Sequence, residues 1–208
     1  MLSLAEGTKA VQFARRIIHE YVTKEKTFSS DLGVPFHEKQ GVFVTLHTFT
    51  DHELRGCIGI PLPVMSLQEA ILESAQSVTR DPRFPPLDKS ELSAVIVEVT
   101  VLTKPEPIKV TQPQEYPTRI IIGRDGLIVE QNFCKGLLLP QVPIEQQWDA
   151  EEFLSHTCMK AGLPPDAWFD KNTKIFKFQG QIFTEEKPHG PIKEIHLNGS
   201  NCRGKTIP

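Results

Sequence analysis

The chain has 208 residues, which is long enough for one large domain or two small ones with a sizeable buried core. Hydrophobic residues make up 39% of it and charged residues 24%, as in an ordinary globular protein. The 23 Lys and Arg residues against 26 Asp and Glu residues give a net charge of -3, which argues against nucleic-acid binding as the main task.

No apolar run approaches the roughly 20 residues that a bilayer span needs, and the N-terminus lacks the basic and apolar segments of a secretory signal. No Cys-x-x-Cys pair occurs among the four cysteines, Cys57, Cys134, Cys158 and Cys202. We therefore expect a cytoplasmic protein without membrane association, structural zinc site or disulfide framework.

The first half of the chain reads as helix, hairpin, helix and strand. Capping-box patterns at Ser3 with Glu6 and at Ser66 with Glu69 each precede an amphipathic stripe. They predict helices over about residues 4–24 and 67–78. β-branched and aromatic runs predict strands at 42–49, 54–60 and 94–102, with a turn at 50–53.

The second half begins with a proline-rich connection at 105–117. Strands are predicted at 119–123 and 127–131 around an Arg124-Asp125-Gly126 turn, at 136–139 and at 175–183. Asp149 and Glu152 cap a helix through Ala161, and an extended tail follows from Glu185. The sequence thus predicts an α+β fold with a larger unit from residues 1–110 and 172–208 and a smaller inserted unit at 111–171.

The segment Leu54–Ile60 carries the clearest chemical signal. In an extended strand, Arg55, Cys57 and Gly59 share one face, and a guanidinium on the same face as a thiol can lower its pKa. Gly56 and Gly59 leave room for a ligand or another backbone. Cys57 is therefore a candidate catalytic thiolate, although a free cysteine also fits a buried core.

The nearby histidines give weaker candidates for a base. The simplest turn places Leu46 beside Cys57 and His47 on the opposite face, so a Cys57–His47 pair requires a bulge or a register shift. His52 in the turn is more often solvated. The spacing of these residues does not match common zinc sites, so no metal site is predicted.

A rigid turn at Asp81, Arg83 and Phe84 offers a second part of the site. It is either a surface Asp–Arg pair or a wall that presents Arg83 and Phe84 to an anionic or planar ligand. Asp81 is a candidate mate for Arg55. Glu98 interrupts a valine strand and is solvated, hydrogen-bonded or, as the lesser alternative, a general base. The apolar run before Gln141 either packs in the core ahead of a turn or lets Gln141 bond to a ligand.

Three motifs together resemble the AMMECR-type domain family. They are Leu54-Arg55-Gly56-Cys57-Ile58-Gly59, Asp81-Pro82-Arg83-Phe84 and Leu138-Leu139-Pro140-Gln141-Val142, with Trp148 and the end of the helix at 158–163 in addition. The resemblance covers about residues 4–190. It implies a two-part α+β fold with these motifs near a cleft between the parts, and kinship with proteins encoded beside Memo-like and radical-SAM proteins in microbes.

Two functions are favoured by the sequence, and a third, a nucleic-acid-binding regulator with a continuous basic stripe, is disfavoured by the acidic balance. In the first, an enzyme or enzyme component binds a small anionic ligand through Arg55, Gly56, Gly59, Asp81, Arg83, Phe84 and Gln141, with Cys57 as the reactive group. In the second, the same motifs form a docking surface of a non-catalytic adaptor, with Memo-like or radical-SAM proteins as candidate partners. The sequence does not identify a cofactor.

Overall fold

The structure is a computed structural model that describes residues 1–25 and 31–195. Contacts between Cα atoms divide the described chain into unit 1, residues 1–103 and 181–195, and unit 2, residues 104–180. The predicted bounds of the inserted unit were residues 111 and 171. The strand β7 (Lys174–Glu185) contributes its first part to unit 2 and its last part to unit 1.

Unit 1 contains the two helices whose caps are visible in the sequence. Ser3 accepts a hydrogen bond from the backbone N–H of Glu6, and the Glu6 carboxylate accepts one from the backbone N–H of Ser3, at the start of α1 (Leu4–Thr23). Ser66 and Glu69 form the same capping box at the start of α2 (Leu67–Ser77). Both helices therefore begin where local hydrogen bonding dictates.

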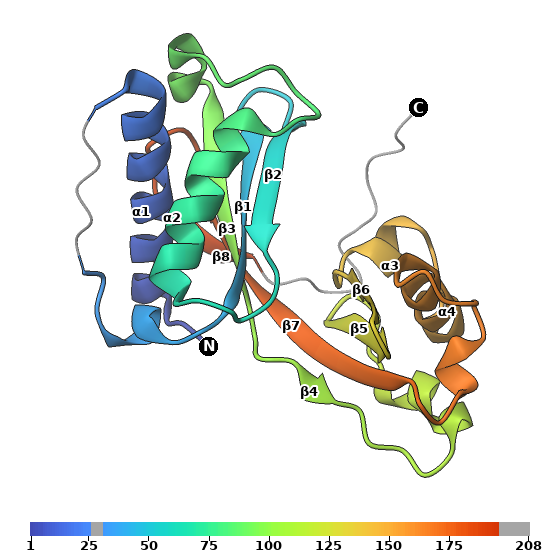
Figure 1. Cartoon of the computed structure of the whole chain (residues 1–208). Helices are drawn as coiled ribbons and strands as arrows, with labels where there is room; N and C mark the ends of the chain where they lie inside the picture. Colours follow the sequence, from blue (N-terminus) through green and yellow to red (C-terminus); the bar gives the residue numbers. More distant parts are fainter. Residues whose placement is uncertain (26–30, 196–208) are drawn as a thin grey trace. The chain divides into compact units, whose positions relative to one another are not determined.

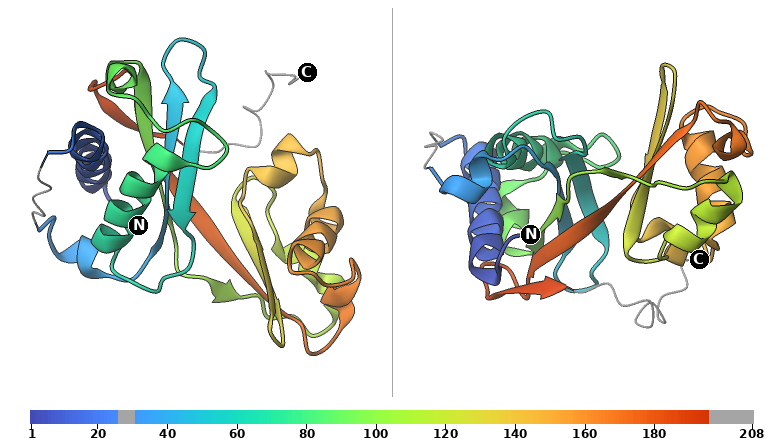
Figure 2. Two further views of the ribbon diagram at one scale, coloured as in Figure 1. Left: turned by 45° about the horizontal axis from the view of Figure 1, so that its top comes forward. Right: turned by 90° about the horizontal axis from the view of Figure 1, so that it is seen from below.

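The unit 1 sheet is antiparallel around the strand β1 (Gly41–Thr48), which pairs with β2 (Leu54–Ile60) and β3 (Val95–Leu102). β2 lies at the edge, and β7 follows β3 and pairs with β8 (Ile192–Ile195). The helices α1 and α2 cover one face of this sheet (Figures 1 and 2). Short 3-10 helices lie at η1 (Val34–His37), η2 (Val78–Arg80) and η3 (Lys89–Ser93).

The core of unit 1 lies between these helices and the sheet. Fully buried members include Ile17, Ile18, Val44, Leu46, Ile71, Val97 and Val99. Successive strand residues point to opposite faces, so the residues between them on β1 and β3 lie on the face away from the helices. We call this the second face; it carries Phe43, Thr45 and His47 of β1 and Ile96, Glu98 and Thr100 of β3.

An ion pair between Arg15 of α1 and Glu185 of β7 is buried inside unit 1, with side chains 8% and 4% exposed. Arg15 also donates hydrogen bonds to the carbonyls of Leu92 and Val95, and Glu185 accepts one from the backbone N–H of Val97. The pair is therefore well supplied with partners, as a buried pair must be if it is not to destabilise the fold.

Unit 2 contains β4 (Glu106–Pro107), β5 (Asp125–Gln131), β6 (Cys134–Leu138) and the first part of β7. β7 pairs antiparallel with β4 and β5, and β5 pairs with β6. The helical segments are η4 (Pro113–Arg119), α3 (Val142–Glu145), α4 (Ala150–Lys160) and η5 (Ala167–Phe169). α4 packs against β5 and β6 over a core that includes Leu127, Val129, Phe153, Leu154 and Trp168.

The predicted hairpin around Arg124-Asp125-Gly126 is wrong. β5 begins at Asp125, whose buried carboxylate pairs with Arg124 and accepts the backbone N–H of Ile121. These bonds fix a turn over the apolar residues that the sequence assigns to a strand. β5 instead turns at Asn132 and Phe133 into β6, close to the strand predicted at 136–139.

The chain is of the α+β class, with antiparallel strands and several helices, as predicted. β4 and β8 are additional strands in segments predicted to be connection and tail. The remainder of the predicted tail, residues 196–208, lies outside the described residues. No helix in the described part of the chain is long and apolar enough to cross a membrane.

Candidate functional site

A bulge in β2 determines how the Leu54–Ile60 segment meets β1. Leu46 pairs with Gly56, whereas the next residue of β1, His47, pairs with Leu54. Arg55 is therefore the extra residue of the bulge. The strict alternation of side chains that the sequence suggested is interrupted at this residue.

The hairpin pairs His47 with Leu54, and the bulge at Arg55 then shifts the register by one residue, so Thr45 lies opposite Cys57. The Thr45 hydroxyl donates a hydrogen bond to the Cys57 Sγ over 3.4 Å. His47 lies two residues farther along β1 and thus on the same face as Thr45 and Cys57. The prediction that Leu46 lies beside Cys57 and His47 on the opposite face is wrong, because it assumed that Phe49 pairs with Leu54 and that the hairpin has no bulge.

Arg55 is held by Glu91. Its Nε donates to Glu91 Oε1 over 2.7 Å and its Nη2 to Oε2 over 3.0 Å, and Nη2 also donates to the carbonyl of Pro85. The Arg55 side chain is only 13% exposed, and its hydrogen bonds lower the pKa of Glu91. The candidate pairing of Arg55 with Asp81 is therefore wrong.

Asp81 instead joins Arg83 to the backbone of Cys57. Its carboxylate accepts the Cys57 N–H over 2.9 Å, and Arg83 Nε and Nη2 over 3.0 and 2.7 Å. Arg83 Nη2 also donates to the Cys57 carbonyl over 3.2 Å. Asp81 and Arg83 thus satisfy the backbone of the edge strand β2, where the sheet offers no further strand.

The electrostatic environment of Asp81 follows from these bonds. The Asp81 side chain is 1% exposed, whereas that of Arg83 is 55% exposed. The hydrogen bonds from Arg83, followed by those from the backbone, hold the pKa of Asp81 far below its usual range. Asp81 therefore stays ionised, and Arg83 presents a fixed guanidinium to solvent.

The Cys57 thiol is not activated in this structure. Burial raises its pKa, and Glu98 and Asp81 add to this effect. The Thr45 hydrogen bond and the charge of Arg83 act in the opposite direction without overcoming burial. The expectation that Arg55 lowers the pKa of this thiol is wrong, since Arg83 is the arginine that acts on it.

Cys57, Thr45 and Glu98 form a row across three neighbouring strands. Thr45 is the register partner of Cys57 on β2 and of Glu98 on β3. Burial alone raises the pKa of Glu98 to about 7, and no hydrogen bond to its carboxylate occurs among the described residues. Such a carboxyl can exchange a proton near neutral pH.

A cavity of about 210 Å³ lies beside Glu98 in unit 1. We call it the Glu98 cavity; its lining residues are His47, His52, Ile96, Glu98, Thr184, Glu185, Glu186, Lys193 and Ile195. Burial, and then the charge of His52, lower the pKa of His47, so its imidazole is neutral at pH 7.

The two glycines of the motif are explained by close packing. A Cβ at Gly59 would lie 2.4 Å from the Phe43 ring and from the carbonyl of Val42. A Cβ at Gly56 would lie 3.0 Å from the carbonyl oxygen of Val78. Their part in ligand binding stays a prediction.

Phe84 interacts with both arginines of the motif. The guanidinium carbons of Arg55 and Arg83 lie 5.9 and 5.6 Å from the centre of its ring, within the range of cation–π interactions. The structure therefore brings Arg55, Cys57, Asp81, Arg83 and Phe84 together around β2. Gln141 belongs to unit 2, where its carbonyl accepts hydrogen bonds at the start of α3.

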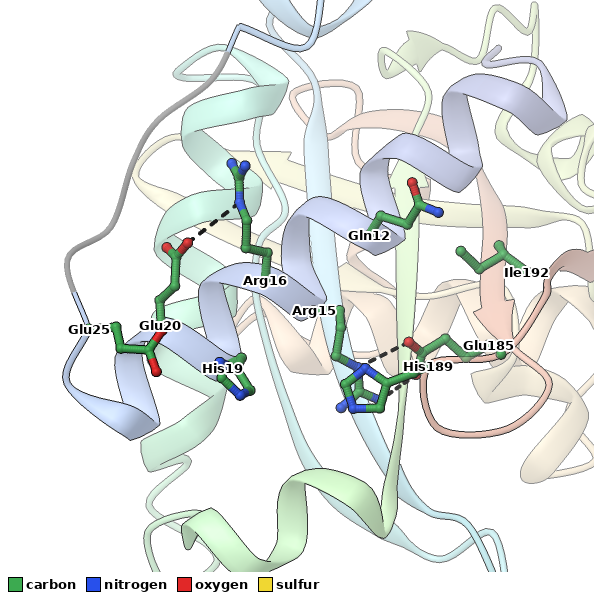
Figure 3. A pocket seen from close by; sticks show the side chains of 10 residues that line it. Gln12, Arg15, Arg16, His19, Glu20, Glu25, Glu185, His189 and Ile192 are labelled. Atoms are coloured by element: carbon green, nitrogen blue, oxygen red, sulfur yellow. Dashed lines mark hydrogen bonds and ion pairs between the residues drawn. The ribbon is translucent and has the colours of Figure 1, made fainter.

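A larger cavity, of about 410 Å³, lies elsewhere in unit 1, between α1 and the turn before β8 (Figure 3). It contains none of the residues that the sequence singled out. Arg15 and Glu185 are joined to each other in its wall, and Arg16 lies close to Glu20 (Figure 3). Several charged side chains of this cavity thus pair with each other, which makes it the weaker candidate for a ligand site.

The remaining cysteines offer no second reactive centre. Cys158 is buried in the unit 2 core, and burial raises its pKa to about 11. Cys134 is half-buried on β6, and Cys202 lies outside the described residues. Among residues 1–25 and 31–195 no group of three or more His, Cys, Asp or Glu side chains could hold a metal ion.

Thr45 and Glu91 are site residues that the sequence reasoning missed. Neither contact follows from the sequence pattern alone. Thr45 lies opposite Cys57 because the strand register is shifted, and Glu91 binds Arg55, the extra residue of the bulge. The sequence marked Glu98 only as a carboxylate within a valine run; in the structure it is half-buried, and burial raises its pKa.

Comparison with known proteins gives a consistent result over nearly the whole chain. The sequence profile of the AMMECR1 family matches residues 11–183. Protein MJ0810 of Methanocaldococcus jannaschii is 53% identical over 198 residues, which cover 95% of this chain and 98% of that protein. Protein PH0010 of Pyrococcus horikoshii is 51% identical over 197 residues, covering 92% and 95%.

The fold agrees with a solved structure as well. The crystal structure of the uncharacterised protein PH0010 matches with a TM-score of 0.81 at 50% identity, covering 93% of this chain and 98% of that one. None of these names states an activity.

Proposed function

The chain belongs to the AMMECR1 family, and we propose that it binds a small anionic ligand beside β2, where Arg83 holds the anion and the Cys57 thiol contacts it. The observation that carries the proposal is the fixed, half-exposed guanidinium of Arg83 next to this thiol.

The hydrogen bonds of Arg83 support this role. Asp81 fixes its Nε and Nη2, and no hydrogen bond among the described residues uses its Nη1. A guanidinium held in one orientation loses little entropy when it binds an anion. Because Asp81 balances part of the charge, the expected affinity is modest.

Catalysis by Cys57 is the further part of the proposal. The thiol is protonated in the free protein at neutral pH, because burial raises its pKa. A nucleophilic thiolate would therefore have to form in the complex with the ligand. The predicted role of Gln141 as a contribution from unit 2 stays a prediction.

The charge of Arg83 can be tested with two alkylating reagents that differ in charge. We expect Arg83→Gln to lower the ratio of the alkylation rates of Cys57 by iodoacetate and iodoacetamide about two- to tenfold, because the anionic reagent loses its partner. Peptide mapping by mass spectrometry measures the reaction at Cys57 alone. Inorganic phosphate should slow the reaction in the wild type and have less effect in the variant.

The matched control is Arg80→Gln, which removes an exposed arginine that stacks on Tyr21. Its rate ratio should equal that of the wild type. The rate should also rise with pH through a midpoint above 9.0, the ordinary value for this thiol, and Arg83→Gln should raise that midpoint further. A rate ratio that is the same with and without Arg83 would sink the anion-site proposal.

A partner-docking function is the second candidate. It is favoured by Phe133, which is fully exposed in the turn between β5 and β6. We expect Phe133→Ser to weaken binding to a purified Memo-like protein, measured by calorimetry, about tenfold or more if this turn is the docking point. Equal affinity of the two proteins would remove Phe133 from the interface.

A further inference from the structure

The Glu98 cavity contains three carboxylates, and two of them already have cationic partners. Glu185 is bonded to Arg15, and Glu186 lies 3.7 Å from Lys193. Glu98 has no ion pair or hydrogen bond among the described residues. The protein therefore leaves one carboxylate of this cavity without a counter-charge.

The other groups that face Glu98 do not supply a positive counter-charge for its carboxylate. Its neighbours across the second face are the hydroxyl of Thr45 and the thiol of Cys57, both neutral at pH 7. His47 is neutral as well, since its pKa is lowered, and His52 is the other imidazole of the lining. The charged lining residues from β7, the turn after it and β8 are Glu185, Glu186 and Lys193, which belong to the ion pairs already named, and Glu194 of β8 accepts a hydrogen bond from Gln181.

Glu98 is half-buried, and a carboxylate that has lost part of its contact with water costs free energy unless a donor or a cation satisfies it. We infer that the Glu98 cavity binds a small organic cation of the amine or guanidine class, with Glu98 as its counter-charge. The volume of about 210 Å³ is below that of cavities for drug-sized ligands and suits a small molecule. An anion would meet an uncompensated carboxylate there, and the described residues include no group of His, Cys, Asp or Glu side chains placed to hold a metal ion.

The titration of Glu98 predicts how this binding depends on pH. A cation favours the ionised carboxylate, so binding releases the proton that the free carboxyl holds below about pH 7. The affinity should therefore increase with pH and become constant once Glu98 is ionised in the free protein. With a pKa of about 7, the ionised fraction grows about tenfold between pH 6 and pH 8.

The test uses methylguanidinium and butylammonium as probes, measured by calorimetry on the full chain at constant ionic strength. At least one probe should bind in a saturable manner, about tenfold more tightly at pH 8 than at pH 6. Glu98→Gln keeps the shape of the side chain and should weaken that binding at least tenfold. Glu73→Gln, an exposed change on α2, should leave it unaltered.

A measurement on the wild type guards against a variant that misfolds. Carbon NMR of the Glu98 carboxyl should show that a saturating probe lowers its pKa. The inference is overturned if neither probe binds, if affinity is equal at pH 6 and pH 8, or if Glu98→Gln binds as the wild type does. Arg83→Gln should not change these results, so the cation site and the proposed anion site can fail separately.

Discussion

Replacing Glu185 with alanine is expected to lower the free energy of unfolding by about 3–5 kcal/mol, because it leaves the Arg15 guanidinium buried without a counter-charge. The backbone N–H of Val97 loses its acceptor in the same variant. Denaturant unfolding followed by circular dichroism measures the change.

The neighbouring residue provides the control. Glu186 is half-exposed and lies 3.7 Å from Lys193, so Glu186→Ala should alter the free energy of unfolding by less than about 1 kcal/mol. Arg15→Met combined with Glu185→Leu should be less destabilised than the sum of the two single changes, since neither charge is then left alone. Equal losses for Glu185→Ala and Glu186→Ala would show that the buried pair contributes little.

Asp81→Asn is expected to lower the free energy of unfolding by about 2–3 kcal/mol. The amide keeps one acceptor oxygen, but it cannot hold both Arg83 nitrogens and the Cys57 N–H with a full charge. Thermal and denaturant unfolding at pH 7 measure the loss. Asp166→Asn, a change at an exposed aspartate, should have a much smaller effect.

The same variant has a distinct acid response. The pKa of Asp81 is depressed in the folded protein, so its contribution is fully present above the ordinary value of 3.8 and is lost as pH falls below it. The stability difference between wild type and Asp81→Asn should therefore shrink from pH 5 towards pH 2. A difference that stays constant over this interval would mean that the Asp81 charge is not what stabilises the turn.

The local parts of the fold could be predicted from the sequence because local interactions determine them. Ser3 with Glu6 and Asp149 with Glu152 cap their helices within one turn of chain, and the structure confirms both. The turn at Asp125 could not be predicted, because it depends on which backbone N–H the carboxylate accepts. β8 could not be predicted from its own residues, because its extended conformation depends on pairing with β7.

The candidate site likewise combines features that the sequence predicts with features that depend on residues distant in the chain. The sequence correctly singled out the motifs around Cys57 and Asp81, which the structure joins by hydrogen bonds. It assigned the wrong arginine to the thiol, because the bulge at Arg55 requires Glu91, 36 residues later, to hold the side chain. Periodicity within one strand contains no information about such a partner.

The burial of Arg15 has a consequence for the order of synthesis. Arg15 leaves the ribosome early, whereas Glu185 follows 170 residues later, after all of unit 2. Until then, the segment that carries α1, β1, β2, α2 and β3 lacks both its last strands and the counter-charge of this arginine. A nascent or truncated chain that ends near residue 103 is therefore expected to remain incompletely folded. During synthesis, unit 1 is expected to need chaperones until the strands after residue 180 have emerged.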